Sequence, residues 1–377
     1  MSLAKLLEHD GNWGKRVSRL GMLWARPKPV IGTTETDVIH AENKWKLLRY
    51  RRTTPAKFDT PVLMIPSLIN RHYVLDLAPG KSLTEYLLAE GHDVFVIDWG
   101  TPGPEDRSVS FDRYCDDYIG RALRKTAAFS SRNKAHLLGY CLGGTLAAMH
   151  AAVRPKHVAS VATLAAPVRF DDDGLLAAWT NVRSFDIRAL IDAVGNVPPW
   201  LLQAAFHMLR PTLSLAKAVH VVDRAHDDEF LEGFLALETW GNDNIPFPGA
   251  AFERYITELY QQNLLVKGEF RLSGQRVDLT RLAMPLLVVT FQHDNIVSEQ
   301  SAKALFDVAT ATDKVHLDLH GGHVGAVVSR KAGGRLWPKL TEFWATRDQE
   351  PRTTELPAGA AEPANDYAVT PSRPAQA

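Results

Sequence analysis

The chain has 377 residues, of which 45% are apolar and 23% are charged, and these proportions are ordinary for a folded globular protein. Lysine plus arginine and aspartate plus glutamate both number 43, so the formal net charge is zero and gives no basic excess for nucleic acid. Two cysteines in a chain of this length exclude a disulfide framework and favour a reducing, cytoplasmic setting.

The first 45 residues contain short amphipathic stretches interrupted by prolines, and we expect an N-terminal helical segment over 1–45. The first residues lack the uninterrupted apolar stretch of a signal peptide. No run in the sequence reaches the roughly 20 apolar residues that cross a bilayer. We therefore expect neither secretion nor a membrane span.

From Trp45 onward, strand-like apolar runs alternate with amphipathic helical stretches. A half-buried strand is expected over 45–51, and buried strands are expected over 61–66, 93–99, 135–140, 158–167, 285–291 and 315–320. Helices are expected over 77–90, 111–128, 142–152, 301–308 and 337–344. Strands that alternate with helices indicate an α/β fold with a mainly parallel sheet covered on both faces.

Two segments depart from this alternation. Residues 168–283 are rich in leucine, alanine and tryptophan at helical spacing, and we interpret them as a helical cap inserted into a core of 46–167 and 284–346. Residues 347–377 are rich in proline, alanine and threonine with one aromatic residue, so they cannot bury enough apolar surface to offset ordering. We expect this last stretch to be a disordered tail.

The most informative motif is GYCLG at 139–143, which matches the pattern G-x-nucleophile-x-G with Cys141 in the place of the usual serine. An apolar strand precedes it and an alanine-rich helix follows, which is the setting of a nucleophile elbow in the α/β-hydrolase fold. The alternative is a tight turn with a buried structural cysteine. The flanking strand and helix favour a nucleophile.

A cysteine nucleophile needs a base and an acid that orients the base, and in this fold they follow in the order nucleophile, acid, base. Asp294 follows the strand at 285–291, and His323 follows the last strand and two glycines. We therefore expect a triad of Cys141, Asp294 and His323. The rival residues, interpreted as ordinary loop or strand residues, are His293, His320, Asp313 and Asp318.

The oxyanion hole is expected to use two backbone N–H groups. One belongs to Leu142, directly after the nucleophile, and the other to the loop at 67–70, where we favour Ile69. Side chains cannot identify a backbone donor, so other residues of this loop stay open.

These residues resemble the polyhydroxyalkanoate (PHA) synthase family, and most closely its class III catalytic subunit. The resemblance covers roughly residues 40–345. It rests on a cysteine elbow and a polar loop in one chain, together with further blocks: PSLINRHYVLDLAPGKSL, DVFVIDWGTP, GYCLGGTLAA, FQHDNIVS, GGHVGAVVS and ETWGNDNIPFPG.

The resemblance implies that Cys141 carries the acyl group, that His323 is its base, and that Asp294 works with the histidine. It implies Ile69 as the oxyanion donor, (R)-3-hydroxyacyl-CoA and the growing polyester chain as partners, and a second synthase subunit and a homodimer as further partners. No metal and no cofactor apart from the coenzyme A of the substrate are expected. The family usually has histidine where this chain has Asn295, which leaves the triad unaffected.

Two further hypotheses concern substrate and reaction. Asn70, Arg71 and Asp76 are candidates for substrate binding, although a polar loop can equally hold the oxyanion strand in place. The alternative enzyme is a thioesterase or esterase with the same triad, because one fold supports many activities. The resemblance also implies a cytoplasmic enzyme at the surface of the polymer granule.

Overall fold

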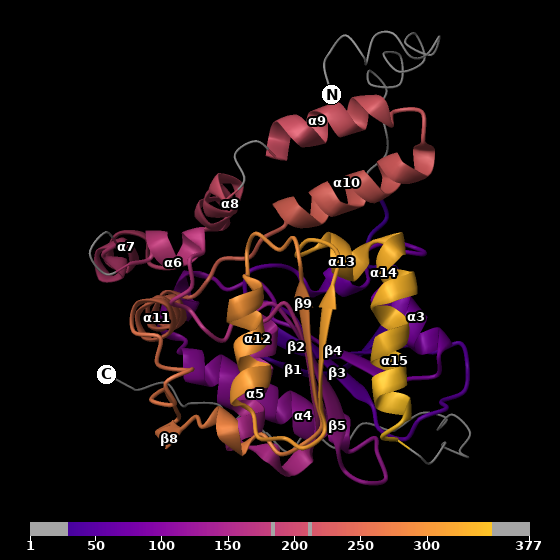
Figure 1. Cartoon of the computed structure of the whole chain (residues 1–377), viewed down its shortest axis with the longest axis horizontal. Helices are drawn as coiled ribbons and strands as arrows, with labels where there is room; N and C mark the ends of the chain where they lie inside the picture. Colours follow the sequence, from indigo (N-terminus) through magenta and orange to yellow (C-terminus); the bar gives the residue numbers. More distant parts are fainter. Residues whose placement is uncertain (1–28, 182–184, 210–212, 349–377) are drawn as a thin grey trace, which may run out of the picture.

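The computed structural model describes residues 29–181, 185–209 and 213–348. A twisted central sheet carries helices on both faces, and an inserted group of helices lies over one edge of the sheet (Figure 1). This arrangement confirms the predicted α/β fold with a mainly parallel sheet.

The eight strands of the sheet follow the order β1-β2-β4-β3-β5-β6-β9-β10. Strands β1 and β2 pair antiparallel, β2 also pairs antiparallel with β4, and the other neighbours are parallel. The bounds are β1 Thr36–Glu42, β2 Trp45–Tyr50, β3 Val62–Ile65, β4 Val94–Asp98, β5 Ala135–Tyr140, β6 Val158–Leu164, β9 Leu286–Phe291 and β10 Lys314–Leu319.

Helices connect these strands and form most of the insertion between β6 and β9. The core helices are α3 Leu83–Ala89, α4 Ile119–Ala127, α5 Leu142–Val153, α12 Glu299–Val308, α13 Gly325–Val328, α14 Arg330–Arg335 and α15 Trp337–Ala345. The insertion holds α6 Leu175–Trp179, α7 Ile187–Val194, α8 Pro199–Met208, α9 Leu213–Asp223, α10 Asp228–Asn242, α11 Gly249–Arg254 and the π-helix η5 Tyr255–Gln261.

Short elements complete the chain: η1 His72–Leu75, η2 Pro104–Ser108, the π-helix η3 Arg113–Tyr118, η4 Pro155–His157, η6 Leu279–Arg281, and the hairpin strands β7 Arg271–Leu272 and β8 Gln275–Arg276.

The central strands are apolar on both faces because helices cover both. In β3, Leu63 and Ile65 face the layer that contains α4, α5 and α12, whereas Val62 and Met64 face the layer of α3 and α15. All four side chains are fully buried. This double burial explains why the strand reads as a continuous apolar run in the sequence.

The parallel strands end at one common edge, and the insertion lies above it (Figure 1). The turns that follow β5, β9 and β10 carry Cys141, Asp294 and His323. In open α/β sheets ligands bind beyond the carboxyl ends of the strands, so this edge is the place for a site.

The structure differs from the predicted N-terminal helical segment over 1–45 in its last part. Residues 36–42 form β1, whose side chains are half-buried or exposed and whose pairing with β2 contains an irregularity near Val38. A polar edge strand has no alternating apolar signal, which is why the sequence did not reveal it. The predicted helical stretches before residue 29 lie outside the described residues.

The insertion between β6 and β9 is largely helical, as expected, but it also contains the hairpin of β7 and β8. We keep 168–283 as the proposed bounds of the cap.

The predicted tail begins two residues too early. Arg347 binds Asp313 through a forked pair of hydrogen bonds, and Asp348 is only 4% exposed. A carboxylate oxygen of Asp348 accepts a hydrogen bond from the backbone N–H of Thr60 at 2.8 Å. The described core therefore extends to Asp348, and the rest of the predicted tail lies outside the described residues.

Asp348→Ala should lower the free energy of unfolding by about 1–3 kcal/mol, because it leaves the buried N–H of Thr60 without its acceptor. Urea unfolding followed by circular dichroism measures this change. Glu342→Ala, at an exposed ion pair with Lys339, is the matched control and should leave the free energy of unfolding nearly unchanged. Equal stability of the two variants would contradict the assignment.

Two buried histidines lie near the amino ends of the central strands. His92 is fully buried against Phe58, and His136 stacks on Trp344. Burial lowers the pKa of each histidine from 6.5 to about 3. Each ring is therefore neutral in the folded protein.

A histidine whose pKa is lowered in the folded state contributes stability that is present above pH 6.5 and lost as pH falls toward 3. His92→Phe should therefore weaken acid destabilisation between pH 6 and pH 4 by up to about 1.4 kcal/mol per pH unit. Urea midpoints across this range measure the slope. His157→Gln, at a partly exposed position, should leave it unchanged.

Candidate active site

Cys141 sits on a sharp bend between β5 and α5. Its backbone has φ 54° and ψ −132°, a strained conformation for a residue with a side chain. Gly139 and Gly143 make the bend possible: a Cβ atom on Gly143 would lie 2.0 Å from the carbonyl oxygen of Ile65. The bend presents Cys141 at the N-terminus of α5, where the helix dipole favours negative charge.

His323 and Asp294 form a buried hydrogen-bonded pair. The ring Nδ1 of His323 lies 2.6 Å from Asp294 Oδ2, and the Asp294 side chain is fully buried. The other carboxylate oxygen accepts hydrogen bonds from the backbone N–H groups of Ile296 and Val297 at 2.8 and 2.9 Å. Asp294 is thus fixed on one side and orients the imidazole on the other.

Cys141 lies close enough to His323 for its charge to shift the pKa of the imidazole. Burial alone would lower the pKa of His323, but the charges of Cys141 and Asp294 outweigh it and raise that pKa above its ordinary value of 6.5. The tyrosine before the nucleophile, Tyr140, donates its hydroxyl to the His323 carbonyl at 3.2 Å and packs on the ring. The structure therefore brings together the three predicted side chains.

The backbone N–H groups of the two predicted oxyanion donors differ in their hydrogen-bond acceptors. Leu142 is the first residue of α5, so the helix supplies no acceptor for its N–H. The N–H of Ile69 donates to the Ser67 hydroxyl at 3.2 Å, while its carbonyl accepts from Ile245 in the cap. Both residues flank Cys141, and their role as oxyanion donors stays a prediction.

Asp76 is not open to a substrate. It is 1% exposed, and its carboxylate accepts hydrogen bonds from the backbone and hydroxyl of Thr34 and from Ser82 at 2.6–3.0 Å. The structure thus gives it the supporting role that was the alternative for this loop, because the carboxylate is buried and three donors of the protein already occupy it.

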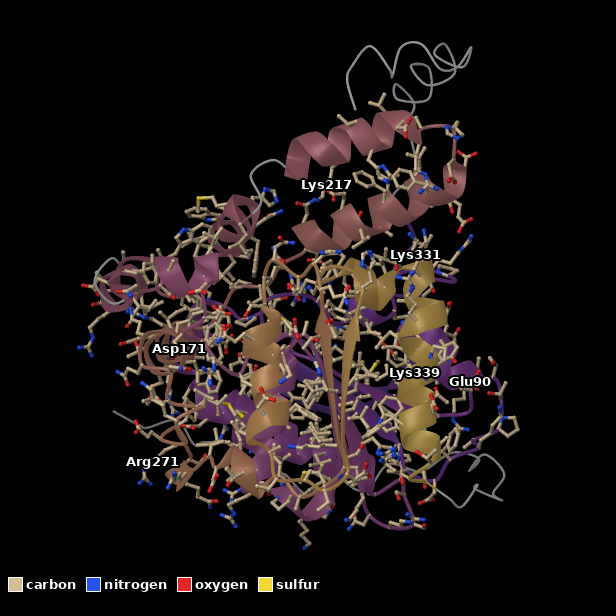
Figure 2. All side chains as sticks on the ribbon, viewed as in Figure 1. Glu90, Asp171, Lys217, Arg271, Lys331 and Lys339 are labelled. Atoms are coloured by element: carbon tan, nitrogen blue, oxygen red, sulfur yellow. The ribbon has the colours of Figure 1, made fainter. Side chains whose placement is uncertain are left out.

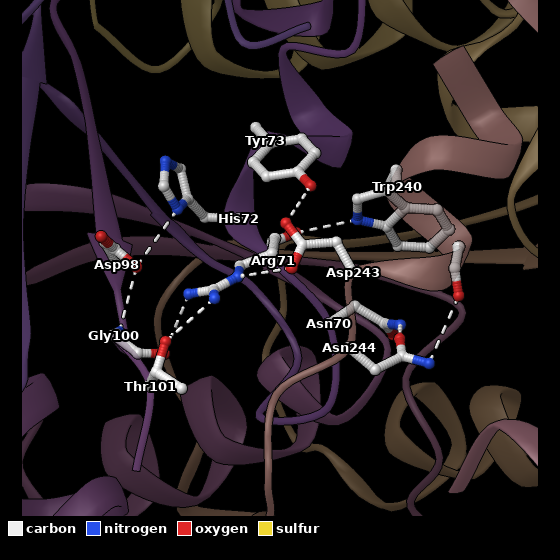
Figure 3. A network of polar contacts seen from close by, with 11 residues as sticks. Asn70, Arg71, His72, Tyr73, Asp98, Gly100, Thr101, Trp240, Asp243 and Asn244 are labelled. Carbon is white, nitrogen blue, oxygen red and sulfur yellow. Dashed lines mark hydrogen bonds and ion pairs between the residues drawn. The ribbon is translucent and has the colours of Figure 1, made fainter. Parts of the chain in front are cut away.

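Arg71 and Asn70 belong to a network between the loop after β3 and the end of α10 (Figure 3). Arg71 binds Asp243 at 3.3 Å, and the indole N–H of Trp240 donates to the Arg71 carbonyl at 3.0 Å. Asn70 donates to Asn244. These contacts tie the cap to the core, and substrate binding by Asn70 and Arg71 stays a prediction.

An apolar cavity of about 440 Å³ opens beside the thiol of Cys141. Its walls come mainly from cap helices and from the loop after β9. The described lining residues include Ile69, Trp179, Phe185, Leu201, Phe206, Phe252, Tyr255, Tyr260 and Ile296. A space of this size and character suits an aliphatic acyl chain.

A second cavity, of about 400 Å³, opens beside His323 and is more polar. Its described lining includes Gln203, His207, Lys217, His220, Asn242 and Asn295. Lys217 lies between α9 and α10 (Figure 2), where it binds Glu238. Cys141 lines the apolar cavity, His323 lines the polar one, and Ile296 lines both. The candidate triad therefore lies between the two cavities.

The rival residues have other surroundings. His293 and His320 are exposed and pack edge to face against each other at 4.6 Å. Asp318 accepts hydrogen bonds from Thr290 and Gln292, and Asp313 binds Arg347. Both cysteines are free, and Cys115, fully buried, directs its thiol to the Leu146 carbonyl.

Within the described parts of the chain, no group of three or more histidine, cysteine or acidic residues could hold a metal ion. None of the helices in residues 29–181, 185–209 and 213–348 is both long and apolar enough to cross a bilayer.

Sequence reasoning missed two tyrosines at the apolar cavity. Tyr255 and Tyr260 lie on η5 and line the cavity together with Cys141. Their spacing of five residues does not fit an α-helical face, so helical periodicity gave no signal for them.

Comparison with known families identifies related proteins. A model described as "alpha/beta hydrolase fold" matches residues 60–328, and one described as "Poly-beta-hydroxybutyrate polymerase (PhaC) N-terminus" matches residues 29–87. The chain is 35% identical over 329 residues to "Poly(3-hydroxyalkanoate) polymerase subunit PhaC" of Haloferax mediterranei, covering 87% of this chain and 67% of that protein. The protein of the same description from Allochromatium vinosum is 34% identical, over 83% of this chain and 88% of that one.

Among solved structures, DcsB in complex with its substrate analogue aligns with a TM-score of 0.52 at 15% identity, over 84% of this chain and 99% of that one. At this identity the likeness supports the fold alone.

Asp294→Asn should lower the pKa of His323, because the charge and the hydrogen bond of the carboxylate both help to raise it. Nuclear magnetic resonance titration of labelled histidine rings measures the shift directly. Asp318→Asn removes a carboxylate on the neighbouring strand that contacts Thr290 and Gln292, and it should leave the titration unchanged. A His323 titration identical to wild type in Asp294→Asn would contradict the pairing.

Proposed function

The chain belongs to the PhaC family of poly(3-hydroxyalkanoate) polymerases within the α/β-hydrolase fold, and we propose that it lengthens a polyester through acyl transfer on Cys141. The acyl donor in this proposal is an (R)-3-hydroxyacyl thioester of coenzyme A. The observation that carries the proposal is a free thiol on a strained bend beside a buried histidine–aspartate pair.

The first half-reaction transfers the acyl group to the enzyme. His323 takes the proton of the Cys141 thiol, and the thiolate attacks the thioester carbonyl of the donor. The coenzyme A thiolate leaves and takes up the proton from the imidazolium. One thioester replaces another, so this step is close to balanced. The raised pKa of His323 supports it, because the imidazolium is stabilised next to a thiolate.

The second half-reaction forms the polymer bond. The hydroxyl of another hydroxyacyl unit attacks the acyl carbonyl on Cys141 while His323 takes the hydroxyl proton. An ester forms, and Cys141 leaves as a thiol after the proton returns to its sulfur. The N–H groups of Leu142 and Ile69 are the proposed donors to the oxyanion. For Ile69 this requires release of its bond to Ser67.

The two cavities suit two different parts of the substrate. The apolar cavity beside Cys141 suits the acyl chain and excludes water, which would otherwise hydrolyse the acyl enzyme. The polar cavity beside His323, with Lys217, His207 and His220 in its lining, suits the coenzyme A portion. Asn70 and Arg71 are proposed to support this arrangement by anchoring the cap, and substrate binding stays a prediction for both.

The relatives from Haloferax mediterranei and Allochromatium vinosum are both described as subunits. We propose that this chain, too, works with a second synthase subunit, that it forms a homodimer, and that it acts at the surface of the growing polymer.

Cys141→Ala should reduce coenzyme A release from (R)-3-hydroxybutyryl-CoA by at least about a thousandfold, because no other group can take the acyl chain. The assay follows free thiol and weighs insoluble polymer, with the purified chain alone and with its candidate second subunit. Cys115→Ala is the matched control, since that thiol is buried against Leu146. It should retain activity.

Two outcomes would oppose the proposal. Release of free 3-hydroxy acid without polymer would favour a thioesterase, the alternative on this fold. Near-normal polymer from Cys141→Ala would remove the proposed nucleophile.

A further inference from the structure

Two tyrosines, Tyr255 and Tyr260, line the otherwise apolar cavity next to Cys141. Thr180 supplies a third hydroxyl to the described lining, but it donates to the Leu176 carbonyl at 2.7 Å in its own helical turn. Polar groups at fixed positions in an apolar pocket are the usual means of orienting a ligand. The two tyrosines are therefore the residues to explain.

The π-helix η5 places both tyrosines on one wall. In an α-helix, residues five apart point about 140° away from each other. In a π-helix the hydrogen bonds join residues five apart, so side chains at this spacing come nearly into line. The bond from Gln262 N–H to the Thr257 carbonyl, at 3.0 Å, shows this five-residue pattern at the end of η5. π-Turns are frequent at functional sites.

Aromatic neighbours hold both rings in place. Phe170, which is 2% exposed, packs edge to face against Tyr260 at 4.9 Å and against Tyr255 at 6.3 Å. Phe247 stacks on Tyr255 at 6.0 Å. Packed rings lose little further freedom when a ligand binds, so their hydroxyls are preorganised.

The two tyrosine rings pack edge to face against each other at 5.4 Å. Burial raises the pKa of both tyrosines, and the side-chain hydrogen bonding between them and the charge on Cys141 contribute further shifts. Both are therefore neutral, proton-bearing groups at physiological pH. A neutral hydroxyl can both donate and accept, so two tyrosines on one wall can offer a donor and an acceptor to a ligand oxygen atom.

We propose that the Tyr255–Tyr260 pair binds the oxygen atom on carbon 3 of the acyl group carried by Cys141. This inference rests on the proposed function and deepens it by naming how a 3-hydroxyacyl group is distinguished from an unsubstituted one. The carbonyl oxygen of the bound acyl group belongs to the oxyanion donors. The oxygen on carbon 3 is then the remaining polar atom of the unit, and the tyrosine pair is the polar feature of the wall around it.

The pair acts by positioning the acyl group and takes no part in proton transfer. A site with buried polar groups discriminates against a substrate that cannot satisfy them, because those groups are left without a partner. Butyryl-CoA, which lacks the oxygen atom on carbon 3, is therefore the matched substrate for comparison with (R)-3-hydroxybutyryl-CoA.

The test measures the rate of Cys141 acylation in a single turnover for both substrates, by mass spectrometry of the intact protein. Tyr255→Phe and Tyr260→Phe should each slow acylation by (R)-3-hydroxybutyryl-CoA by about three- to tenfold, with a clearly smaller loss of rate for butyryl-CoA. The ratio of the two rates falls accordingly. A purely structural role would slow both substrates alike.

Tyr86→Phe is the control variant, since Tyr86 packs on Trp337 in the other helical layer, and its ratio should equal that of wild type. If either cavity variant fails to fold, the wild-type protein alone provides the test. Equal rates of Cys141 acylation by the two substrates in wild type would overturn the inference. An unchanged ratio in folded Tyr255→Phe and Tyr260→Phe would do the same. Wild type that accepts neither substrate would remove the proposed function, and the inference with it.

Discussion

The structure depends on the close approach of α5 to the sheet at the bend around Cys141. Only a residue without a side chain fits at position 143, because the backbone of Ile65 lies where a Cβ atom would be. This contact holds the nucleophile in its strained conformation and brings the amino end of α5 up to the sulfur. The same packing sets Leu142 beside the loop that carries Ile69. A local steric constraint thus fixes both the proposed nucleophile and the backbone groups around it.

Much of this arrangement was predictable because it depends on short-range patterns. The strand at Ala135–Tyr140 was predicted at its observed bounds, since apolar residues filled it and glycines followed. The candidate triad was predicted from chain order in a known topology, although Asp294 and His323 are far from Cys141 in sequence, and its catalytic role stays a prediction. By contrast, β1 was missed because its side chains face solvent, and Asp348 was missed because its partner, Thr60, lies far away in the chain.

The tyrosines of the apolar cavity show a different limit of sequence reasoning. Tyr255 and Tyr260 share a wall only because the helix widens to five-residue hydrogen bonding, which no periodicity rule anticipates. Asp76 shows the reverse case. Its place in a polar loop suggested ligand binding, but the fold encloses it with Thr34 and Ser82. Three-dimensional neighbours, which the linear pattern does not specify, decide both outcomes.

The network at the end of α10 has a mechanical consequence. Asp243 accepts hydrogen bonds from Arg71 and from the Tyr73 hydroxyl, and Trp240 donates one to the same loop. These contacts attach this end of the cap to the core. A polyester lengthens with each added unit, so the product needs a way out of the site. That way out is expected on the side of α6, α7 and α8, away from this tie, where Trp200 and Met208 are exposed. In this view the cap opens on one side, while the end of α10 stays attached to the core.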